Sequence, residues 1–560
     1  MIEERLVSLL REAAAAASPA LGDAPPPETI ELTRPPNREF GDFSTNLALV
    51  WASQLGARPK EVAQAIVDNL PDDPLVERAE VAGPGFVNLF VRPAWLHDAI
   101  REAAELGADY GRAEPMDRRV QVEFVSANPT GPLTIGHARN AAIGDTLARM
   151  LGFTGWSVER EYYFNDAGGQ MDRFGASVEA RFLELIGRDA EVAEDGYHGD
   201  YVVDIARRIR DEHGDGPGDL PPDERFVFMR SEGAHVAMES IRATLARFGV
   251  EIDSYMMEAT LAERGEIEAA VDRLRETGYA FEADGAVWFR STEFGDDKDR
   301  VLIRSNGNHT YFAADCAYLV DKFGRGFHHL LYVWGADHHG DVGRVKGAAR
   351  AMGYDPGAVE ILIYQFVSFL RGGRPVKMSK RAGAFVSLDE LIDTVGTDAA
   401  RYHLLMFGPD SAMNFDIEEV ARQTMDNPVY YVQYAHARIA SILRHAEAQG
   451  VGLKPVHYAS LDLLTHDTET ELMRKIAELP SEVQTATDFR GPHRLTRYAE
   501  ELAALFHRFY GECKVVGEDA ALTQARLWLC RVAKQALANV LGLLGVSAPE
   551  SMERAEHRDG

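Results

Sequence analysis

Cysteine, lysine and long apolar runs are all scarce in this sequence. The three cysteines, Cys316, Cys513 and Cys530, are far apart and odd in number, which argues against a disulfide framework and a cysteine-based zinc site. No stretch approaches the roughly 20 consecutive apolar residues of a membrane span. The opening MIEERLVSLLREAAAAA carries acidic residues where a secretory signal would carry basic ones. We therefore expect a protein of the reducing cytoplasm without a membrane partner.

Positive charge is scarce as well. The chain has 59 basic and 88 acidic residues, a net charge of −29, and only ten of its basic residues are lysines. Indiscriminate nucleic-acid binding needs clustered lysine and arginine, so this composition argues against it but leaves a local basic track open. Two of the ten lysines lie three positions apart in one short segment, RGGRPVKMSKRAGAF at 371–385.

The chain is long enough for roughly two to four domains. Residues 1–112 predict an α+β domain, with an opening helix, a β pattern in VAGPGFVNLFV and a helix in WLHDAIREAAELG. Residues 113–408 alternate helical patterns with strand candidates, which is typical of a parallel α/β sheet; the candidates are VQVEFV, SVEREYYF, HHLLYVWG and VEILIYQFVSF. An insertion at about 170–290 includes a predicted polar loop, IRDEHGDGPGDLPPDERF. Strands disappear from about 410, so 409–560 predicts an all-helical domain.

The segment EFVSANPTGPLTIGHARN at 123–140 passes from a strand through two prolines directly into a helix. Ligands of a parallel sheet bind beyond the carboxyl ends of its strands. Gly136 would let a ligand approach the backbone, and the helix N-terminus and His137 would attract a phosphate. The same Gly-His pair could equally cap or pack the helix. No GxxxxGK[ST] phosphate loop is present.

The segment 371–385 is the second chemical cluster. Glycines flank Lys377 and Lys380, which predicts a mobile basic loop that closes on a migrating phosphate. An ordinary solvated basic turn is the alternative. Immediately after it, Ser387 and Glu390 predict a helix that begins with a capping box.

Taken together and in this order, the two clusters resemble those of the class I aminoacyl-tRNA synthetases. TIGH at 134–137 resembles their HIGH signature, and KMSKR at 377–381 resembles their KMSKS loop. Two residues depart from the pattern, Thr134 in place of the first histidine and Arg381 in place of the last serine. The chain resembles the arginyl-tRNA synthetases in particular through VEFVSANPTGPL, EYYFNDAGGQM, YFAADCAYLVDKF, YVWGADHHG, NPVYYVQYAHAR, FGDFSTNLA and EVAGPGFVNLFV.

The resemblance implies a fold and a reaction. Residues 113–408 would form a Rossmann-like class I catalytic domain, 1–112 a domain that contacts tRNA, and 409–560 a helical domain that binds the anticodon. Arginine would react with ATP to give arginyl-adenylate and pyrophosphate, and would then pass to the 3′-terminal adenosine of tRNA(Arg). Mg²⁺ would ride on the ATP phosphates, and the enzyme would act in the cytoplasm as a monomer.

The resemblance also assigns residues. The catalytic residues would be His137, Lys377 and Lys380. ATP would be bound by Pro132, Thr134, Gly136, His137, Lys377, Met378, Ser379 and Lys380. Arginine would be bound by Glu123, Ser126, Ala127, Asn128, His137, Tyr311, Asp315 and His338, the last at a position where the family often has glutamine.

Other interpretations of these residues remain open from the sequence. By spacing alone, Tyr311 could pack in a core while Asp315 is solvated, and Glu258 is either a further carboxylate of the site or an exposed helix residue. The pairs His328-His329 and His338-His339 do not predict a metal site, since neighbouring strand residues point to opposite faces and no cysteine or carboxylate completes a tetrahedral set.

Three functions therefore compete. An arginine–tRNA ligase would read the anticodon with its C-terminal helices, where Tyr430, Tyr431 and Tyr434 either stack on bases or pack in the core. A free nucleotidyltransferase would have no use for the helical domain. A catalytically silent RNA-binding relative would not need His137, Lys377 and Lys380, although Thr134 leaves that option open. Whether arginine activation waits for bound tRNA does not follow from the sequence.

Overall fold

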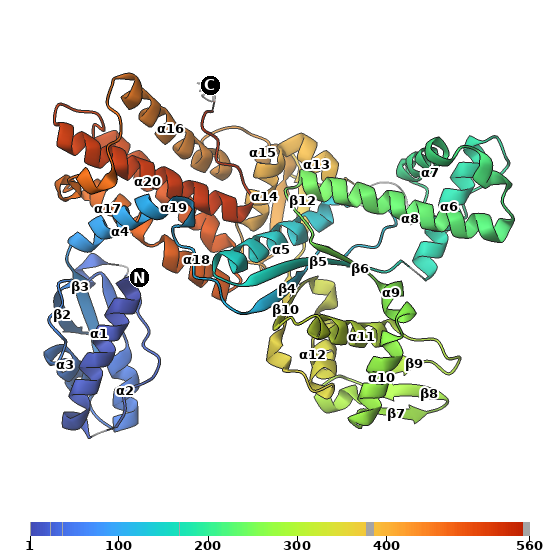
Figure 1. Cartoon of the computed structure of the whole chain (residues 1–560), viewed down its shortest axis with the longest axis horizontal. Coiled ribbons are helices and arrows are strands. Elements are labelled where there is room, and N and C mark those ends of the chain that lie inside the picture. The colour runs from blue at the N-terminus through green and yellow to red at the C-terminus, as the bar shows by residue number, and fades with distance from the viewer. Residues whose placement is uncertain (1, 23, 36, 167, 377–385, 553–560) are drawn as a thin grey trace. The chain divides into compact units, whose positions relative to one another are not determined.

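The computed structural model describes residues 2–22, 24–35, 37–166, 168–376 and 386–552 (Figure 1). The chain forms two compact units, each built from separate stretches of sequence. The first contains Met1–Leu106, Gly452–Ala477 and Cys513–Val532, and the second contains Gly107–Val451, Glu478–Glu512 and Ala533–Gly560. The predicted KMSKR motif lies outside the described residues; it comprises Lys377, Met378, Ser379, Lys380 and Arg381.

The first unit is α+β, as predicted for the N-terminal region. Its strands form an antiparallel sheet in the order β1-β3-β2. The predicted opening helix is present, and Leu6, Leu9 and Leu10 on one of its faces are buried. The elements that lie wholly in this unit are α1 (Ile2–Ala17), β1 (Phe43–Thr45), α2 (Leu47–Leu55), α3 (Pro59–Asp68), β2 (Val76–Ala82), β3 (Phe86–Val91), α4 (Ala94–Leu106) and α17 (Asp467–Ala477).

The second unit is organised by a five-stranded parallel sheet with the order β11-β10-β4-β5-β6. The chain adds β5 and β6 on one side of β4 and β10 and β11 on the other, so the strand order reverses between β4 and β10. This confirms the predicted Rossmann-like parallel sheet. Its strands are β4 (Arg119–Glu123), β5 (Ser157–Phe164), β6 (Ser254–Met257), β10 (His329–Gly335) and β11 (Val359–Tyr364).

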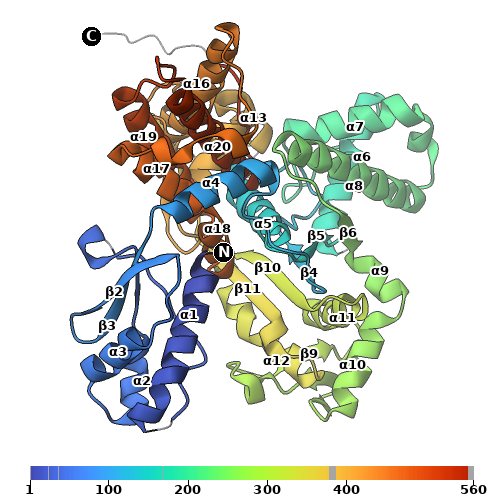
Figure 2. The same ribbon diagram turned by 60° about the vertical axis from the view of Figure 1, so that its left-hand side comes forward.

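Helix α5 (Ile135–Phe153) follows β4 and lies against this sheet (Figure 2). A glycine allows the close approach, because a Cβ at Gly144 would overlap the ring of Phe124. Nearly every side chain of α5 is buried. The first turn of this helix is therefore held rigidly at the edge of the sheet where β4 ends.

Three helices after β5 form a separate group, which we call the helical insertion (Figure 1). They are α6 (Gly169–Leu185), α7 (Asp200–His213) and α8 (Pro222–Arg247), and they enclose their own apolar core. The polar loop predicted for IRDEHGDGPGDLPPDERF is wrong for most of its length, since α7 continues to His213 and α8 begins at Pro222. Ile209 of α7 is buried in the insertion core, and proline suits the first turn of a helix, so both ends of this polar stretch are helical.

The chain between β6 and β10, together with the helix after β10, packs around one apolar core of the same unit. A small antiparallel sheet with the order β7-β8-β9 precedes the helix that contains YFAAD. The elements are α9 (Glu258–Glu263), α10 (Glu266–Glu276), β7 (Ala280–Ala283), β8 (Ala286–Phe289), β9 (Arg300–Ile303), α11 (Tyr311–Gly324) and α12 (Val342–Ala351).

The predicted strand VEILIYQFVSF is two strands in different sheets. It breaks after β11, where the backbone N–H of Gln365 donates to Pro409 O at 2.8 Å, and it resumes as β12 (Val367–Arg371). Strand β12 pairs with β13 (Arg374–Pro375) and with β14 (Met413–Asp416). The prediction that strands end by about 410 is therefore wrong by one strand.

Helices make up the rest of the second unit. The predicted capping box of α13 (Leu388–Val395) is confirmed, with Ser387 and Glu390 each accepting the other's backbone N–H at 3.0 and 2.8 Å. The remaining helices are α14 (Thr397–Leu405), α15 (Ile417–Val420), α16 (Pro428–Ala448), α18 (Leu479–Asp488) and α19 (His493–Glu512), while α20 (Ala520–Leu544) contributes to both units. In the described ranges α20 is the one helix long and apolar enough for a membrane, but most of that apolar window is buried in the protein, as in an ordinary core helix.

Candidate active site at the carboxyl edge of the central sheet

The reversal of strand order between β4 and β10 creates a crevice at the carboxyl ends of these strands, the usual ligand position in open α/β sheets. The predicted residues Ser126, Ala127 and Asn128 follow β4 there, and His338 follows β10. The fold therefore brings together two predicted groups that are about two hundred positions apart in sequence.

The turn after β4 has an unusual backbone. Val125 and Ser126 have φ angles of 65° and 43°, and Ser126 N donates to Phe124 O at 2.9 Å across a three-residue turn. A β-branched residue with positive φ is strained by roughly 1–3 kcal/mol and is kept only where its surroundings enforce it. Here Asn140 of α5 enforces it, because its Oδ1 accepts from Val125 N at 2.7 Å and its Nδ2 donates to Val333 O of β10 at 2.9 Å.

Strand β5 and the residue after it hold the segment 126–128. Ser126 Oγ accepts from Tyr163 N at 3.1 Å, and Asn128 Oδ1 accepts from Asn165 N at 3.2 Å. The hydroxyl of Tyr162 donates to Ala127 O at 2.7 Å and lies 3.1 Å from Ala127 N. The predicted Ser-Ala-Asn segment is therefore fixed from one side, at the mouth of the crevice.

Asp315 is on α11, one turn after Tyr311. Burial and the negative charges of Glu258 and Glu123 raise its pKa to about 7. The side chain nevertheless remains accessible to solvent, so it lines a recess rather than the packed core. Over the described ranges of the chain, its carboxylate makes no hydrogen bond or ion pair. A carboxylate that is crowded by other negative charges and has no partner is unfavourable, and a bound cation would relieve this cost.

Two further carboxylates contribute to this negative recess. Glu258 begins α9 and is half-buried rather than exposed, and Tyr163 donates to its Oε2 at 2.9 Å. Burial raises the pKa of Glu258, and the charge of Asp166 adds to that increase. Glu123 is buried, and its Oε2 lies 2.5 Å from the ammonium of Lys322. Lys322 pairs with Glu123 alone among these three carboxylates, and the charge of Arg344 only partly offsets the carboxylates around Asp315, whose pKa remains raised.

Tyr311 and His338 lie at the rim of this recess. Tyr311 is the first residue of α11 and is 63% exposed, which excludes the alternative that it packs in a core. Its spacing of four from Asp315 places both on one helix face, as predicted. His338 is in the short helix η6 (Ala336–Asp341), 3.6 Å from Asp341, whose charge also acts on Asp315.

The start of α5 forms the other half of the crevice. Thr134 caps the helix, and its backbone N–H donates to His137 Nδ1 at 3.0 Å. Because Nδ1 accepts this bond, the proton of a neutral His137 is on Nε2, which is then a donor. Thr134 therefore has a local structural role that accounts for its presence in the signature. Gly136 is exposed at the same helix start, and Pro132 precedes it half-buried.

The segment after 377–385 is tied directly to the signature. Ile135 N donates to Val386 O at 3.1 Å, and Leu388 N donates to Leu133 O at 2.9 Å. These bonds place Val386, the first described residue after 377–385, beside the start of α5. Before that segment, Gly372 and Gly373 form a hairpin turn whose N–H groups donate to Asp416 at 3.2 and 2.7 Å.

Arg139 is a buried residue of the site that the sequence analysis did not single out. Its side chain is 0% exposed and donates to Gln365 O at 2.6 Å, Ser411 O at 2.8 Å and Gly408 O at 2.9 Å. These bonds join the N-terminal part of α5 to the residue after β11 and to the segment 408–411. Its position two residues after His137 was the one sequence feature that could have pointed to it. The backbone carbonyls that it binds are too distant in the sequence to be predicted.

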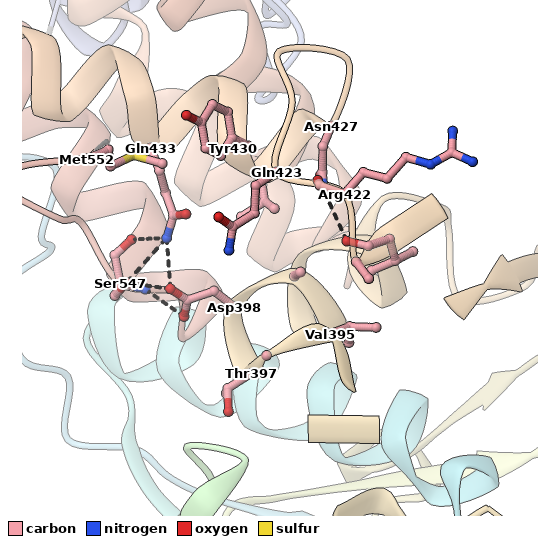
Figure 3. Close-up of a pocket in the computed structure, with 15 residues that line it drawn as sticks. Val395, Thr397, Asp398, Arg422, Gln423, Asn427, Tyr430, Gln433, Ser547 and Met552 are labelled. Atoms are coloured by element: carbon pink, nitrogen blue, oxygen red, sulfur yellow. Dashed lines mark hydrogen bonds between the residues drawn. The ribbon is translucent and has the colours of Figure 1, made fainter. Parts of the chain in front are cut away.

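A separate cavity of about 620 Å³ lies in the second unit among α14, α15 and α16 (Figure 3). Tyr430 is buried and lines it, and Gln433 Nε2 donates to Asp398 Oδ2 at 2.8 Å and to Ser547 O at 2.9 Å. Tyr431 and Tyr434 are half-buried instead, and their rings lie 5.1 and 6.1 Å from that of His507.

Comparisons with known proteins agree with these features. Residues 4–91 match the arginyl tRNA synthetase N terminal domain, 100–440 the catalytic domain of tRNA synthetases class I (R), and 432–552 the DALR anticodon binding domain. The chain is 46% identical over 528 residues to an arginine–tRNA ligase of Desulforamulus reducens, covering 94% of each chain. It is 45% identical over 555 residues to that of Moorella thermoacetica, covering 98% of this chain and 99% of the relative.

A solved structure indicates the same family. The arginyl-tRNA synthetase of Thermus thermophilus superposes with a TM-score of 0.76 at 25% identity, covering 97% of this chain and 100% of that one. The strand order, the signature at the start of α5 and these matches along nearly the whole length agree with one another. The chain belongs to the arginyl-tRNA synthetase family.

Proposed function

We propose that the crevice between β4 and β10 is the place where this chain joins arginine to ATP. The chain catalyses the ATP-dependent ligation of arginine to tRNA. In the first step the arginine carboxylate attacks the α-phosphorus of ATP and pyrophosphate leaves. In the second, the terminal adenosine of tRNA(Arg) takes the arginyl group and AMP leaves. Both steps require two ligands to be aligned and negative charge on phosphate to be stabilised.

The guanidinium of arginine binds in the negative recess. The observation that carries this assignment is Asp315, an accessible carboxylate on which the charges of Glu258 and Glu123 act. A planar cation that donates several hydrogen bonds satisfies such a group better than a point charge does, which favours arginine over lysine. Tyr311 covers the guanidinium from the rim, and Glu123 acts mainly by holding Ser126, whose Oγ lies 3.3 Å from Glu123 Oε1.

The polar end of arginine lies towards the turn after β4. Its amino and carboxylate groups are surrounded by Ser126, Ala127, Asn128 and His338. Because the turn leads directly into the signature helix, a carboxylate held there faces the phosphates of ATP. The strain at Val125 is consistent with a segment whose shape is set by function rather than by its own preference.

ATP binds at the N-terminus of α5. Its phosphates accept from the first-turn N–H groups and from His137 Nε2, while Pro132, Thr134 and Gly136 border the nucleotide. The ATP site is completed by Lys377, Met378, Ser379 and Lys380, which lie outside the described residues. Mg²⁺ accompanies the triphosphate; the described residues contain no group of three or more side chains placed to hold an ion by themselves.

The N-terminal region 1–112 and the helical region 409–560 contact the tRNA, and the enzyme acts as a cytoplasmic monomer. The 620 Å³ cavity beside Tyr430 has room for a splayed base, with the Gln433 amide at its wall. Tyr431 and Tyr434 offer half-buried rings beside His507, and burial lowers the pKa of His507 to about 4, so that its ring is neutral. Aromatic stacking of this kind is how single-stranded RNA bases are commonly held.

Aminoacylation assays with chemically matched amino acids test the proposal. The purified chain, tRNA and ATP are supplied with arginine, lysine or citrulline, which replaces the guanidinium by a neutral ureido group. We expect aminoacylation with arginine alone, because the recess requires a planar cation. Efficient use of citrulline would contradict a charge-based pocket, and use of lysine would contradict the planar, forked contact.

A further inference from the structure

The turn Thr130–Gly131 joins the two halves of the crevice. It lies between Asn128, on the arginine side, and Thr134, which caps the helix on the ATP side. Both residues of the turn are buried. Any movement of this turn changes the distance between the two bound ligands, and in-line attack is sensitive to displacements of about 1 Å.

A tyrosine from the helical insertion covers this turn. The hydroxyl of Tyr201, in the first turn of α7, donates to Thr130 O at 3.1 Å. Its ring lies so close to Gly131 that a Cβ there would be 2.8 Å from the ring edge, and Gly131 has a φ of 149°. Only glycine accommodates both this backbone and this ring. Burial raises the pKa of Tyr201, so its hydroxyl remains a donor throughout the physiological range.

The insertion also reaches the other side of the turn. Asn128 Nδ2 donates to Gln170 Oε1 at 3.0 Å, and Gln170 is in the first turn of α6. The body of Tyr201 packs against the apolar core that α6, α7 and α8 share. The insertion therefore contacts the segment 128–131 at both ends, through two helices of one packed group.

The charge of the insertion does not suit a phosphate-binding role. Residues 169–247 include 17 acidic and 10 basic residues. Many of the arginines are already paired within the insertion, such as Arg225 with Glu179 at 2.6 Å and Arg230 with Asp172 at 2.8 Å. Binding RNA backbone would require the opposite balance, whereas a support for the active-site turn has no such requirement.

We propose that Tyr201 is a positioning residue for the ligation reaction, through which the helical insertion holds the Thr130–Gly131 turn and keeps the arginine and ATP halves of the crevice in register. Tyr201 touches neither ligand. It acts on the backbone that connects them. This inference rests on the proposed function of the crevice.

The test compares Tyr201→Phe, Tyr201→Ala and the control Tyr197→Ala. Tyr197 is buried in the same insertion core, where it packs edge-on to Phe174, but it is not bonded to the turn. Arginine-dependent ATP–pyrophosphate exchange is measured with tRNA present, beside thermal unfolding of the full chain. We expect Tyr201→Ala to lower kcat about 10- to 100-fold with each KM changed less than about threefold. Tyr201→Phe, which keeps the ring, should retain kcat within about fivefold.

Tyr197→Ala separates positioning from general stability. It should lower the melting temperature at least as much as Tyr201→Ala while keeping kcat within about threefold. The inference would be overturned if Tyr201→Ala kept the wild-type kcat. It would also be overturned if both alanine variants lost kcat in proportion to their loss of stability. Asp315→Asn is assayed in parallel: an unchanged KM for arginine in that variant would count against the proposed function itself, whatever Tyr201 does.

A double-mutant cycle with Gly131→Ala tests the contact directly. The added methyl meets the Tyr201 ring, so Gly131→Ala should reduce kcat strongly in the wild-type background. Part of that loss should disappear when Tyr201→Ala removes the ring, which makes the two effects less than multiplicative. Fully multiplicative losses would mean that the ring does not set the turn, and would overturn the inference.

Discussion

The ammonium of Lys322 lies 2.5 Å from Glu123 Oε2, and both side chains are buried. The ammonium also lies 4.0 Å from the ring centre of Tyr318 and 3.9 Å from that of Tyr332. The other oxygen of Glu123 accepts from Ser126, so this ion pair connects the interior of the protein to the strained turn of the active site. Lys322 thereby compensates one of the three carboxylates and leaves Asp315 available for the substrate.

Removing Lys322 should therefore destabilise the protein substantially. Lys322→Met leaves a buried carboxylate without its cation, which costs roughly 3–5 kcal/mol in the free energy of unfolding. Denaturant unfolding measures this loss. Adding Glu123→Gln removes the uncompensated charge, so the double variant should recover part of the stability. A double variant that is less stable than Lys322→Met would contradict the ion-pair interpretation.

Arginine use should depend on pH through Asp315. Its pKa is raised from the ordinary value of 3.8 to about 7, so the free site is protonated at pH 6 and ionised at pH 8. Guanidinium binding requires the ionised form. We expect kcat/KM for arginine to rise about tenfold from pH 6 to pH 8, since one proton leaves over this range. Asp315→Asn should lose this rise. A flat profile in the wild-type chain would show that Asp315 is already ionised at pH 6.

Two substitutions of His137 should separate its structural and chemical roles. The amide oxygen of His137→Asn can occupy the position of Nδ1 and accept from Thr134 N, but the variant has no donor at Nε2. We expect near-wild-type stability and a kcat about 10²- to 10³-fold lower, as for loss of one donor to a developing charge. His137→Ala should lose stability as well, by about 1 kcal/mol. Equal activity in His137→Asn and the wild type would rule out a phosphate contact by Nε2.

Arg139 should be critical for folding rather than for ligand contact. Replacing it by methionine leaves the carbonyls of residues 365, 408 and 411, which bond to the fully buried Arg139 side chain, without this donor. Each such group costs roughly 1–3 kcal/mol, so the unfolding free energy should fall by at least about 3 kcal/mol. Arg494→Met, which removes a partly exposed ion pair with Glu482, is the matched control and should cost about 1 kcal/mol or less. Similar losses in the two variants would contradict this role for Arg139.

Local patterns in the sequence predicted local structure well. The alternation of strands and helices predicted the parallel sheet, and the spacing of Ser387 and Glu390 predicted the cap of α13. The spacing of Tyr311 and Asp315 correctly predicted one helix face, but their exposure required the structure, because the same spacing also fits a core position. The predicted roles of Lys377 and Lys380 remain predictions, since these residues lie outside the described ranges.

Partners distant in the sequence could not be predicted. Glu123 and Lys322 are 199 positions apart, and nothing near either residue indicates the other. The same holds for Asn140, whose amide fixes Val125 on one strand and Val333 on another. The polar loop predicted between α7 and α8 was wrong because it was inferred from the polar, glycine-rich composition alone. The helical spacing of buried positions in α7 continues to Ile209 within this charged stretch. Strand β14 was missed because it has only four residues, and its pairing with β12 decides its structure.

The most direct test of the arginine site is ATP–pyrophosphate exchange by the wild-type chain and Asp315→Asn, with tRNA present and with lysine as the control amino acid. We predict exchange with arginine and not with lysine. In Asp315→Asn the KM for arginine should rise about 10- to 100-fold, as expected for loss of a charged hydrogen-bond partner, while the KM for ATP changes less than about threefold. An unchanged KM for arginine in a folded Asp315→Asn enzyme would contradict the account.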